Sequence, residues 1–442
     1  MLLAFYNGYP IVTADTGSYI SSGFELYPPT DRPIFYGLFI RASSLGLSLW
    51  LTIYAQCLLL SYVFVKFITA WIQKISNAHK TGFLIFASLC TIGGWYASQL
   101  MPDIFVPVMI MSVLIFLKGG GSKKENVLIV VICFVSLITH NSNYITLTLF
   151  SLLVLVCSVI FKRVKYLRLK SLALLGTSLV AWLVLCSSNF LGKKEFTVSN
   201  VTHVFIMGKL VESGVLKTYL DKACPLYDYR ICKFKDSLPP AAWGFVWDGA
   251  SPLQKTGGWE VNRLEYNKII RDIVSRPKYW PYLMFKSSEA TLRQLVLINI
   301  DAVFELEWIK YLNGSPPFEN VAKYFSHELS ELKSSKENNN GLKIDFMNSV
   351  FCICLVASSI TVLLVYQSDV HKELNNIAIL LFVLIILNAF TTATFANVLT
   401  RLNSRVIWLI PVLNAMYIYQ YFAVKLKPRI KMVKVGSGSI EE

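Results

Sequence analysis

Residues 7–36 read NGYPIVTADTGSYISSGFELYPPTDRPIFY, a polar stretch that directly precedes a long series of apolar runs. The stretch places Asp15, Glu25, Asp31 and Arg32 just ahead of the first run. A charged side chain beside a bilayer is costly unless it has a partner or a function. We therefore expect the rest of the chain to be organised around these residues.

The composition indicates an integral membrane protein. Of 442 residues, 54% are hydrophobic and only 16% are charged, whereas a soluble domain has about 25% charged residues. The formal net charge of +15 falls largely in short loops between apolar runs, where orientation in the bilayer explains it. No basic face with interleaved aromatic residues is evident in the sequence, so we expect membrane lipids and no nucleic acid as partners.

Apolar runs predict an all-α polytopic fold with about nine transmembrane helices. A run of about 20 residues matches the thickness of a bilayer, and shorter runs suit tilted, broken or re-entrant spans. The third and fourth runs are short. In order, the runs are Leu47–Trp71, Gly82–Gln99, Ile104–Leu117, Val127–Thr139, Tyr144–Phe161, Ser171–Phe190, Ser349–Gln367, Ile377–Phe395 and Val406–Val424.

The distribution of lysine and arginine predicts the orientation of these helices. Every odd-numbered run ends at a basic segment, which includes KRVKYLRLK at residues 162–170 and KLKPRIKMVK at residues 425–434. By the positive-inside rule, these ends face the cytoplasm. The opposite ends then share the outer face, and they are residues 7–44, 101–103, 140–143, 191–348 and 397–405.

This topology divides the chain into five parts. They are an outer N-terminal loop (1–46), helices one to six (47–190), an inserted, mainly helical extracytoplasmic domain (191–348), helices seven to nine (349–424), and a basic cytoplasmic tail with a flexible terminus (425–442). Within the insertion, Lys255–Arg276 and Lys278–Leu297 are predicted helices that Pro277 separates. Residues 326–341 are polar and predict a mobile helix and linker.

The cysteines and histidines predict one disulfide and no zinc site. Seven of nine cysteines lie in apolar runs, where cysteine behaves as a small hydrophobe. Cys224 and Cys232 lie eight residues apart in a polar segment, and they should form a disulfide if that compartment is oxidising. The five histidines are scattered without metal-ligand spacing.

Two aspartates on the outer face are candidate catalytic carboxylates. Asp15, at the membrane boundary, could act as a general base toward an acceptor hydroxyl, or it could simply cap a helix. Asp103 could hold an acceptor or a divalent cation such as Mg²⁺ or Mn²⁺, or Pro102 and Asp103 could only start the next helix. One carboxylate pair is a weak metal site, so no cofactor is asserted.

Further polar residues on this face are candidates for binding a phosphate. His140 and Asn143 lie in a turn between two apolar runs, where they could contact substrate or only satisfy the turn. Arg401 and Arg405 are four residues apart, which puts them on one helical face if the last helix begins early. Guanidinium groups bind oxyanions bidentately, although interfacial anchoring is an alternative.

These features together resemble the GT-C superfamily of integral membrane glycosyltransferases, which use polyprenyl-phosphate-linked sugars. The resemblance rests on Asp15 in DTGSY, on Arg32, Pro33 and Tyr36 in an Arg-Pro-x-x-Tyr stretch, on the Pro102–Asp103 turn, and on Arg401 and Arg405 ahead of Pro411. It implies a base role for Asp15, a supporting role for Asp103, substrate contacts at Arg32 and Tyr36, and donor-phosphate contacts by Arg401 or Arg405. Two features depart from the family pattern, since only MLLAFY precedes Asn7 where a complete span is usual, and the long outer insertion is not C-terminal.

The sequence therefore predicts a membrane glycosyltransferase that moves a sugar from a polyprenyl-phosphate-linked donor to a lipid, glycan or protein acceptor. We expect it in a bacterial plasma membrane, with the active site facing the periplasm or exterior. A non-catalytic transporter or flippase of a lipid-linked glycan is the alternative, and its polar residues should continue through the bilayer midplane. An acyl- or phospho-group transferase is a weaker alternative, because no Ser-His-Asp or Cys-His arrangement is evident.

Overall fold

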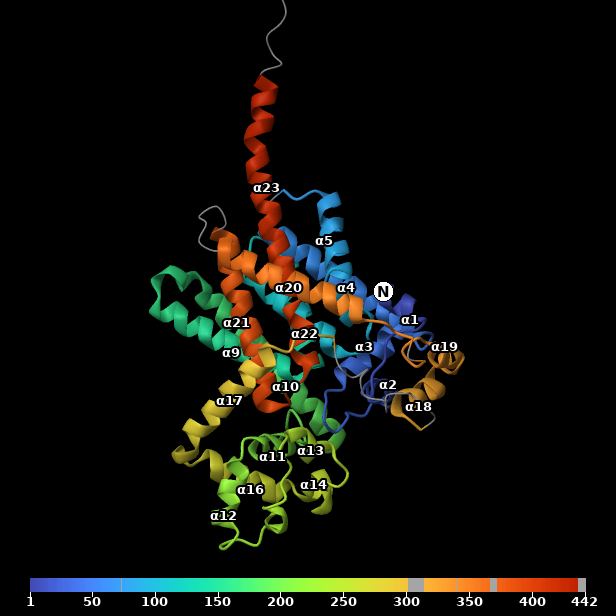
Figure 1. Ribbon diagram of the computed structural model, residues 1–442, viewed down its shortest axis with the longest axis vertical. Helices are drawn as coiled ribbons and strands as arrows, with labels where there is room; N and C mark the ends of the chain where they lie inside the picture. The colour runs from blue at the N-terminus through green and yellow to red at the C-terminus, as the bar shows by residue number, and fades with distance from the viewer. Residues whose placement is uncertain (73, 301–313, 340, 366–371, 436–442) are drawn as a thin grey trace, which may run out of the picture.

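The fold is described from a computed structural model that covers residues 1–72, 74–300, 314–339, 341–365 and 372–435 (Figure 1). The end of the predicted run Ser349–Gln367 and the terminus at 436–442 lie outside the described residues. Regular structure in the described part is helical, apart from an isolated parallel bridge between Ile11 and Gln99. The chain thus has the all-α character that the apolar runs predict.

Six helices are long and apolar enough to cross a membrane, which confirms a membrane-embedded protein. They include α4 (Leu49–Trp71), α9 (Asn141–Ile160), α10 (Arg168–Lys193), α20 (Asp345–Val365) and α21 (Lys372–Phe395). The sixth candidate span, Thr400–Ala423, comprises α22 (Thr400–Ile407) and the start of α23 (Leu409–Val435). Much of their surface is apolar and exposed, as lipid-facing helices require.

The prediction of nine spans is not confirmed, because three runs form shorter helices. The run Gly82–Gln99 divides into α5 (Asn77–Leu89) and α6 (Gly93–Ser98), while α7 (Phe105–Lys118) and α8 (Lys123–Thr139) have 14 and 17 residues. Between α5 and α6, the Thr91 hydroxyl donates to the Ala87 carbonyl and accepts from the Gly93 amide. These bonds and the Gly93–Gly94 pair favour a break there.

Three of the basic helix ends lie close together, as the charge pattern predicts. Lys118 at the end of α7 pairs with Glu373 in the first turn of α21, with Nζ 2.7 Å from Oε2. Lys170 at the start of α10 donates to the Leu117 carbonyl over 2.8 Å. Residues 202–274 of the insertion lie at the opposite end of the molecule (Figure 1). Which end faces the cytoplasm stays a prediction.

A small separate core occupies the first part of the insertion. It is built from α11 (Thr202–Glu212), α12 (Val215–Ala223), α13 (Ala242–Trp247), α14 (Pro252–Lys255), α15 (Gly258–Val261) and α16 (Arg263–Val274). The predicted disulfide between Cys224 and Cys232 is confirmed. The predicted helix Lys255–Arg276 is wrong in its first half, because Gly257 and Gly258 have φ of 114° and 79° and interrupt it.

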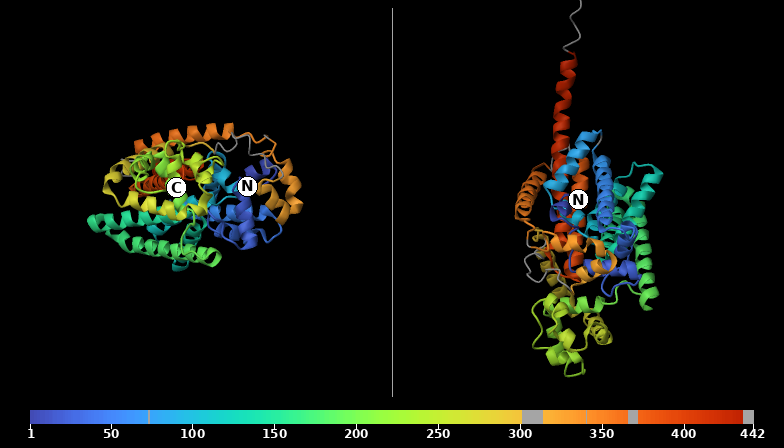
Figure 2. Two further views of the ribbon diagram at one scale, coloured as in Figure 1. Left: turned by 90° about the horizontal axis from the view of Figure 1, so that it is seen from below. Right: turned by 90° about the vertical axis from the view of Figure 1, so that its right-hand side faces the viewer.

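The other described helices of the insertion pack against the membrane body, so the described residues of 191–348 do not form one unit. Helix α17 (Trp280–Leu295) begins after Pro277 as predicted, and its Gln294 bonds the backbone of Leu399 in both directions. Helices α18 (Pro316–Tyr324) and α19 (Leu329–Ser334) lie beside the N-terminal region in Figure 1 and in both views of Figure 2.

The prediction of a mobile linker at 326–341 is wrong for its described residues. The Glu328 carboxylate is buried and accepts from the Tyr9 hydroxyl at 2.9 Å and from the Leu49 amide at 3.1 Å. The Glu337 carboxylate accepts from the Val12 amide, and its own amide donates to the Asn7 side chain. These bonds tie the segment to the N-terminal loop, although no local sequence signal announces contacts between residues some 300 positions apart.

The N-terminal region forms two short helices in close contact, α2 (Thr16–Glu25) and α3 (Phe35–Ser44), after α1 (Leu2–Asn7). A Cβ atom added to Gly23 would lie 2.1 Å from the Gly37 carbonyl oxygen, so the two backbones meet at glycine. On its other side, α2 meets α18, because a Cβ on Gly17 would lie 2.3 Å from the Pro316 carbonyl carbon. Glycine therefore permits α3 and α18 to approach α2 closely, near its end and its start respectively.

Candidate functional site

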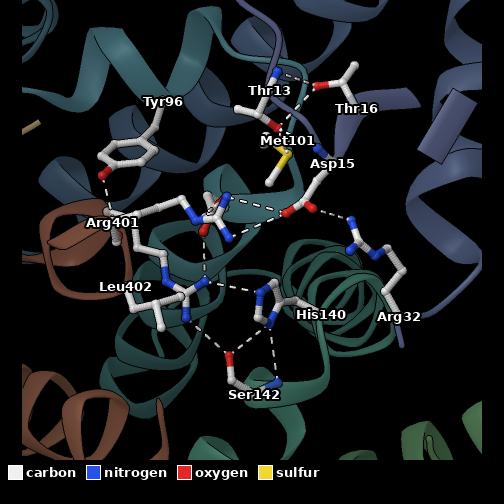
Figure 3. A network of polar contacts seen from close by, with 12 residues as sticks. Thr13, Asp15, Thr16, Arg32, Tyr96, Met101, His140, Ser142, Arg401 and Leu402 are labelled. Atoms are coloured by element: carbon white, nitrogen blue, oxygen red, sulfur yellow. Dashed lines mark hydrogen bonds and ion pairs between the residues drawn. The ribbon is translucent and has the colours of Figure 1, made fainter. Parts of the chain in front are cut away.

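Asp15 occupies the N-cap position of α2, but its side chain does not cap the helix. The turn is held instead by threonines, since the Thr13 amide donates to the Thr16 hydroxyl over 2.8 Å and the Asp15 amide donates to the Thr13 hydroxyl. The carboxylate is consequently available to groups outside its own helix (Figure 3). The capping alternative for the Asp15 side chain is thus wrong.

Two arginines hold the Asp15 carboxylate from different parts of the chain. Nη1 of Arg32 lies 3.0 Å from Oδ1 of Asp15, and Nη1 and Nη2 of Arg401 each lie 3.5 Å from Oδ2. Figure 3 shows the carboxylate between these two guanidinium groups. Arg32 is itself fixed by a bidentate contact to Asp31, at 3.0 and 2.6 Å.

A second, deeper layer pairs Asp103 with Arg405. Asp103 lies in a short 3₁₀ turn (η1, Pro102–Ile104) before α7, and Nη1 of Arg405 donates to its Oδ1 over 2.7 Å. Arg401 spans both layers, because its Nε is 3.9 Å from Oδ2 of Asp103. Helix α22 starts at Thr400, so Arg401 and Arg405 share one face, as predicted for an early start of the last helix.

His140 and two neutral residues complete the binding of Arg405. Nη1 of Arg405 lies 3.1 Å from Nε2 of His140, and Nη2 donates to the Ser142 hydroxyl at 3.1 Å and to the side-chain oxygen of Asn388 at 3.3 Å. Arginine is only a donor, and the Ser142 amide donates to Nδ1 of His140 over 3.2 Å, so both ring nitrogens face donors. The other ring nitrogen, Nδ1, lies 2.8 Å from the Ser142 hydroxyl. The geometry therefore favours a neutral imidazole that orients Arg405.

Exposure decreases from Asp15 inward, which gives the cluster an open and a closed side. The Asp15 side chain is 31% exposed, while the side chains of Arg32 and Arg401 are 15% and 18% exposed. Asp103 and Arg405 are 2% and 0% exposed. A ligand would thus reach Asp15 and the flanking arginines first, and the buried pair beneath would hold Arg401 in place.

The charges of the cluster control the ionisation of Asp15. Burial raises the pKa of this carboxyl, but the Arg32 and Arg401 guanidinium groups outweigh burial and hold the pKa below its usual value. Asp15 is therefore ionised at neutral pH and ready to accept a proton. The same two arginines make it a weaker base than an isolated carboxylate for as long as they remain paired with it.

The two remaining predicted residues, Tyr36 and Asn143, lie at the edge of the cluster. The Tyr36 hydroxyl donates to the Gln56 side chain over 3.2 Å, and its ring meets Tyr19 edge-on at 5.0 Å. The ring of Tyr19 in turn lies 5.1 Å from the Arg32 guanidinium, so Tyr19 links Tyr36 to the cluster. The Asn143 amide turns away and donates to the Ser136 carbonyl of α8. Substrate binding by Tyr36 and Asn143 stays a prediction.

The carboxylates of the cluster do not fit a divalent cation. A cation site needs several oxygen ligands that are not already neutralised, whereas Asp15, Asp31 and Asp103 each contact a guanidinium group. No group of three His, Cys, Asp or Glu residues that could hold a metal ion occurs in the part of the chain that the structure describes. We therefore assign no chemical step to Mg²⁺ or Mn²⁺.

Three polar members of the cluster were not among the predicted site residues. Asp31 lies next to Arg32, Ser142 lies within the His140–Asn143 turn, and Asn388 is a polar residue inside the run Ile377–Phe395. A buried amide in an apolar helix is itself a signal, because it needs a polar partner. For Asn388 that partner is Arg405, together with the Leu402 carbonyl, to which its amide donates over 2.9 Å.

Fold and site together define an all-α membrane protein with a balanced cluster of three arginines and three aspartates at one end of its helices. No protein-family model, curated protein or solved structure matches this chain.

Proposed function

We propose that this protein is a membrane glycosyltransferase that moves a sugar from a polyprenyl-phosphate-linked donor to a lipid, glycan or protein acceptor, at the extracytoplasmic face of a bacterial plasma membrane. The observation that carries the proposal is the partly exposed Asp15 carboxylate between the guanidinium groups of Arg32 and Arg401. This arrangement offers one proton acceptor and two oxyanion binders within reach of one ligand.

In an inverting displacement, each group has a defined task. The acceptor hydroxyl oxygen attacks the anomeric carbon and forms the new glycosidic bond, while Asp15 takes the hydroxyl proton. The bond between the anomeric carbon and the donor phosphate oxygen breaks, and polyprenyl phosphate leaves with the electron pair. Arg401 and Arg32 hold that phosphate, so the developing negative charge meets fixed donors.

Donor binding would also activate the base. A phosphate competes with Asp15 for Arg401, whose contacts to Asp15 at 3.5 Å are longer than the 2.7 Å contact between Arg405 and Asp103. When the phosphate draws the Arg401 guanidinium away from Asp15, the positive charge that lowers the Asp15 pKa moves away from the carboxylate. Asp15 then becomes a better proton acceptor when the donor is in place.

Three polar residues inside the apolar helices have local partners, which favours this proposal over the transporter alternative. The Gln56 amide donates to the Ala97 and Gln99 carbonyls, the Thr392 hydroxyl donates to the Asn388 carbonyl, and the Asn388 side chain bonds Arg405. These three side chains are satisfied locally, although the Thr391 and Thr394 hydroxyls of α21 have no hydrogen-bond partner. A transport pathway needs polar groups that face a water-filled passage.

The test is transfer of radiolabelled sugar from a panel of polyprenyl-phosphate sugars, in membranes that contain the full chain. We expect Asp15→Asn to reduce transfer by about 10²–10⁴-fold, the usual contribution of a general base. The matched control is Asp236→Asn, which makes the same change at a side chain that is 72% exposed. Transfer by Asp15→Asn at the level of the control would exclude Asp15 as the base.

A further inference from the structure

A polar cavity lies where α10 meets the small core of the insertion. Its volume is about 380 Å³, within the range of about 300–1,000 Å³ that is usual for small-molecule sites. Its wall comes from the loop after α10, the start of α11 and one face of α16, and includes Glu195, Asn200, His203, Arg263 and Asn267. This cavity takes no part in the proposed chemistry of the Asp15 cluster.

The inner wall of the cavity holds a buried polar atom without a partner. Asn200 is 3% exposed, and its side-chain oxygen accepts no hydrogen bond, although its backbone carbonyl accepts from Nη2 of Arg263 over 2.9 Å. A buried amide oxygen left unsatisfied is unfavourable, because it has lost its bonds to water. A ligand that donates a hydrogen bond to this oxygen would remove that penalty.

The loop that carries Asn200 is held in place before any ligand arrives. The Asn189 amide donates to the Thr197 and Val198 carbonyls, both over 2.8 Å, which fixes the loop to the end of α10. On the other wall, Nε2 of His203 lies 2.8 Å from the Trp259 carbonyl. The cavity is therefore preformed, which reduces the entropy lost on binding.

The charge balance of the cavity favours a neutral ligand. Glu195 and Arg263 are ion-paired with each other, so neither offers an uncompensated charge. Burial lowers the pKa of His203, so this imidazole is neutral at pH 7. Amide and hydroxyl groups without net charge suit a ligand that presents many hydroxyls, whereas a phosphate would need an unpaired cation.

An aromatic ring at the rim suits the apolar face of a sugar. Phe196 lines the cavity and is 54% exposed, and its ring is held edge-on by Trp182 of α10 at 5.8 Å. Asn267 and Thr202, which are also exposed, add polar groups at the same rim. A sugar ring presents C–H groups on one face and hydroxyls at its edge, so an aromatic surface beside amides matches it.

The loop that lines the cavity follows the end of α10, which contacts the loop that carries Arg32. The Lys193 ammonium donates to the Thr30 hydroxyl over 3.1 Å, and a Cβ atom on Gly192 would lie 2.4 Å from the Pro28 ring. The end of α10 thus contacts residues 28–30 directly, while Asp31 and Arg32 follow in the cluster. One extended ligand could occupy the cavity and approach Asp15.

We infer that this cavity binds a neutral glycan, and that it holds the part of a carbohydrate acceptor that lies beyond the reacting hydroxyl. The assignment of an acceptor rests on the proposed transferase function, whereas glycan binding itself does not. Asn200 and Asn267 bond the sugar hydroxyls, and Phe196 packs against a ring face.

The experiment is isothermal titration calorimetry of the full chain in detergent micelles, with cellohexaose, chitohexaose and mannohexaose as probes and inorganic phosphate as an anionic comparison. We expect at least one oligosaccharide to bind. Asn267→Ala, at an exposed rim position, and Asn200→Ala should each weaken binding about tenfold, the effect of losing one or two hydrogen bonds. Asn77→Ala, an exposed site at the start of α5, is the control and should bind as the wild type does.

Three results would overturn the inference. They are no binding of any of the three probes at 10-fold molar excess over millimolar protein, binding that neither asparagine variant weakens, or phosphate binding that Asn267→Ala abolishes. Asp15→Asn should leave glycan binding unchanged. If glycan binding follows expectation while no variant-sensitive transfer is found, the proposed function fails and the glycan site stands.

Discussion

At the scale of single residues, the Asp103–Arg405 pair is a fully buried ion pair. It lies beneath Asp15, Arg32 and Arg401 and supports them. We expect Asp103→Asn to destabilise the protein by about 3–5 kcal/mol, because removing one partner leaves a buried charge uncompensated. Thermal unfolding in detergent would measure this loss. Asp236→Asn, the exposed control, should unfold close to the wild type. Equal unfolding temperatures for the two variants would contradict the stabilising role of the pair.

The Asp15 ion pairs predict how activity depends on pH. Arg32 and Arg401 lower the folded-state pKa of Asp15, so their stabilising contribution is present above the ordinary carboxyl pKa of about 3.9 and is lost as pH falls through the lowered value. Arg401→Gln removes one of the two groups, so the acid limb of the transfer profile should move to higher pH. Arg293→Gln, at a 55% exposed arginine, should leave the limb unmoved. An identical limb in both variants would show that Arg401 does not tune the Asp15 pKa.

At the scale of elements, the contact between α2 and α3 positions both Asp15 and Arg32. We expect Gly23→Ala to destabilise the protein and to reduce transfer, because the new Cβ would lie 2.1 Å from the Gly37 carbonyl oxygen and the helices would have to separate. Gly82→Ala is the matched control. Gly82 lies in α5 with nothing within 4 Å of the added atom, so alanine should stabilise by about 0.5–1 kcal/mol. Unfolding and transfer assays would separate the two, and similar behaviour would contradict close packing at Gly23.

Loss of the disulfide should destabilise mainly the small core of the insertion. Replacing both Cys224→Ser and Cys232→Ser opens an eight-residue loop, and the chain-entropy relation gives a loss of about 2–3 kcal/mol. Limited proteolysis should then cut faster within residues 200–279 and leave the membrane helices intact. Cys157→Ser, at an unpaired cysteine of α9, is the control. Unchanged cutting in the double variant would show that the disulfide does not stabilise this core.

Across the whole molecule, the features that could be predicted from sequence are those that depend on the lengths of the apolar runs and on the positions of charged residues. The alternation of basic loops placed Asp15, Asp103, His140 and Arg401 at one end of the helices, and the structure brings these four residues into one network. Features that depend on side-chain contacts between distant segments were not readable. The bond between the Glu337 amide and the Asn7 side chain joins residues 330 positions apart, and no local propensity encodes it.

The basic helix ends and the small core of the insertion lie at opposite ends of the molecule (Figure 1), so the orientation of the protein in the membrane can be tested. Lys124, exposed at the start of α8, and Asp248, exposed in the small core, mark the two ends. If the positive-inside rule holds, a membrane-impermeant maleimide added to intact cells should label Asp248→Cys and should label Lys124→Cys only after the cells are permeabilised. The wild-type chain gives the background from its native cysteines. The reverse pattern would place the Asp15 cluster in the cytoplasm, where it could act only on donors exposed at that face, and the proposed extracytoplasmic reaction would be excluded.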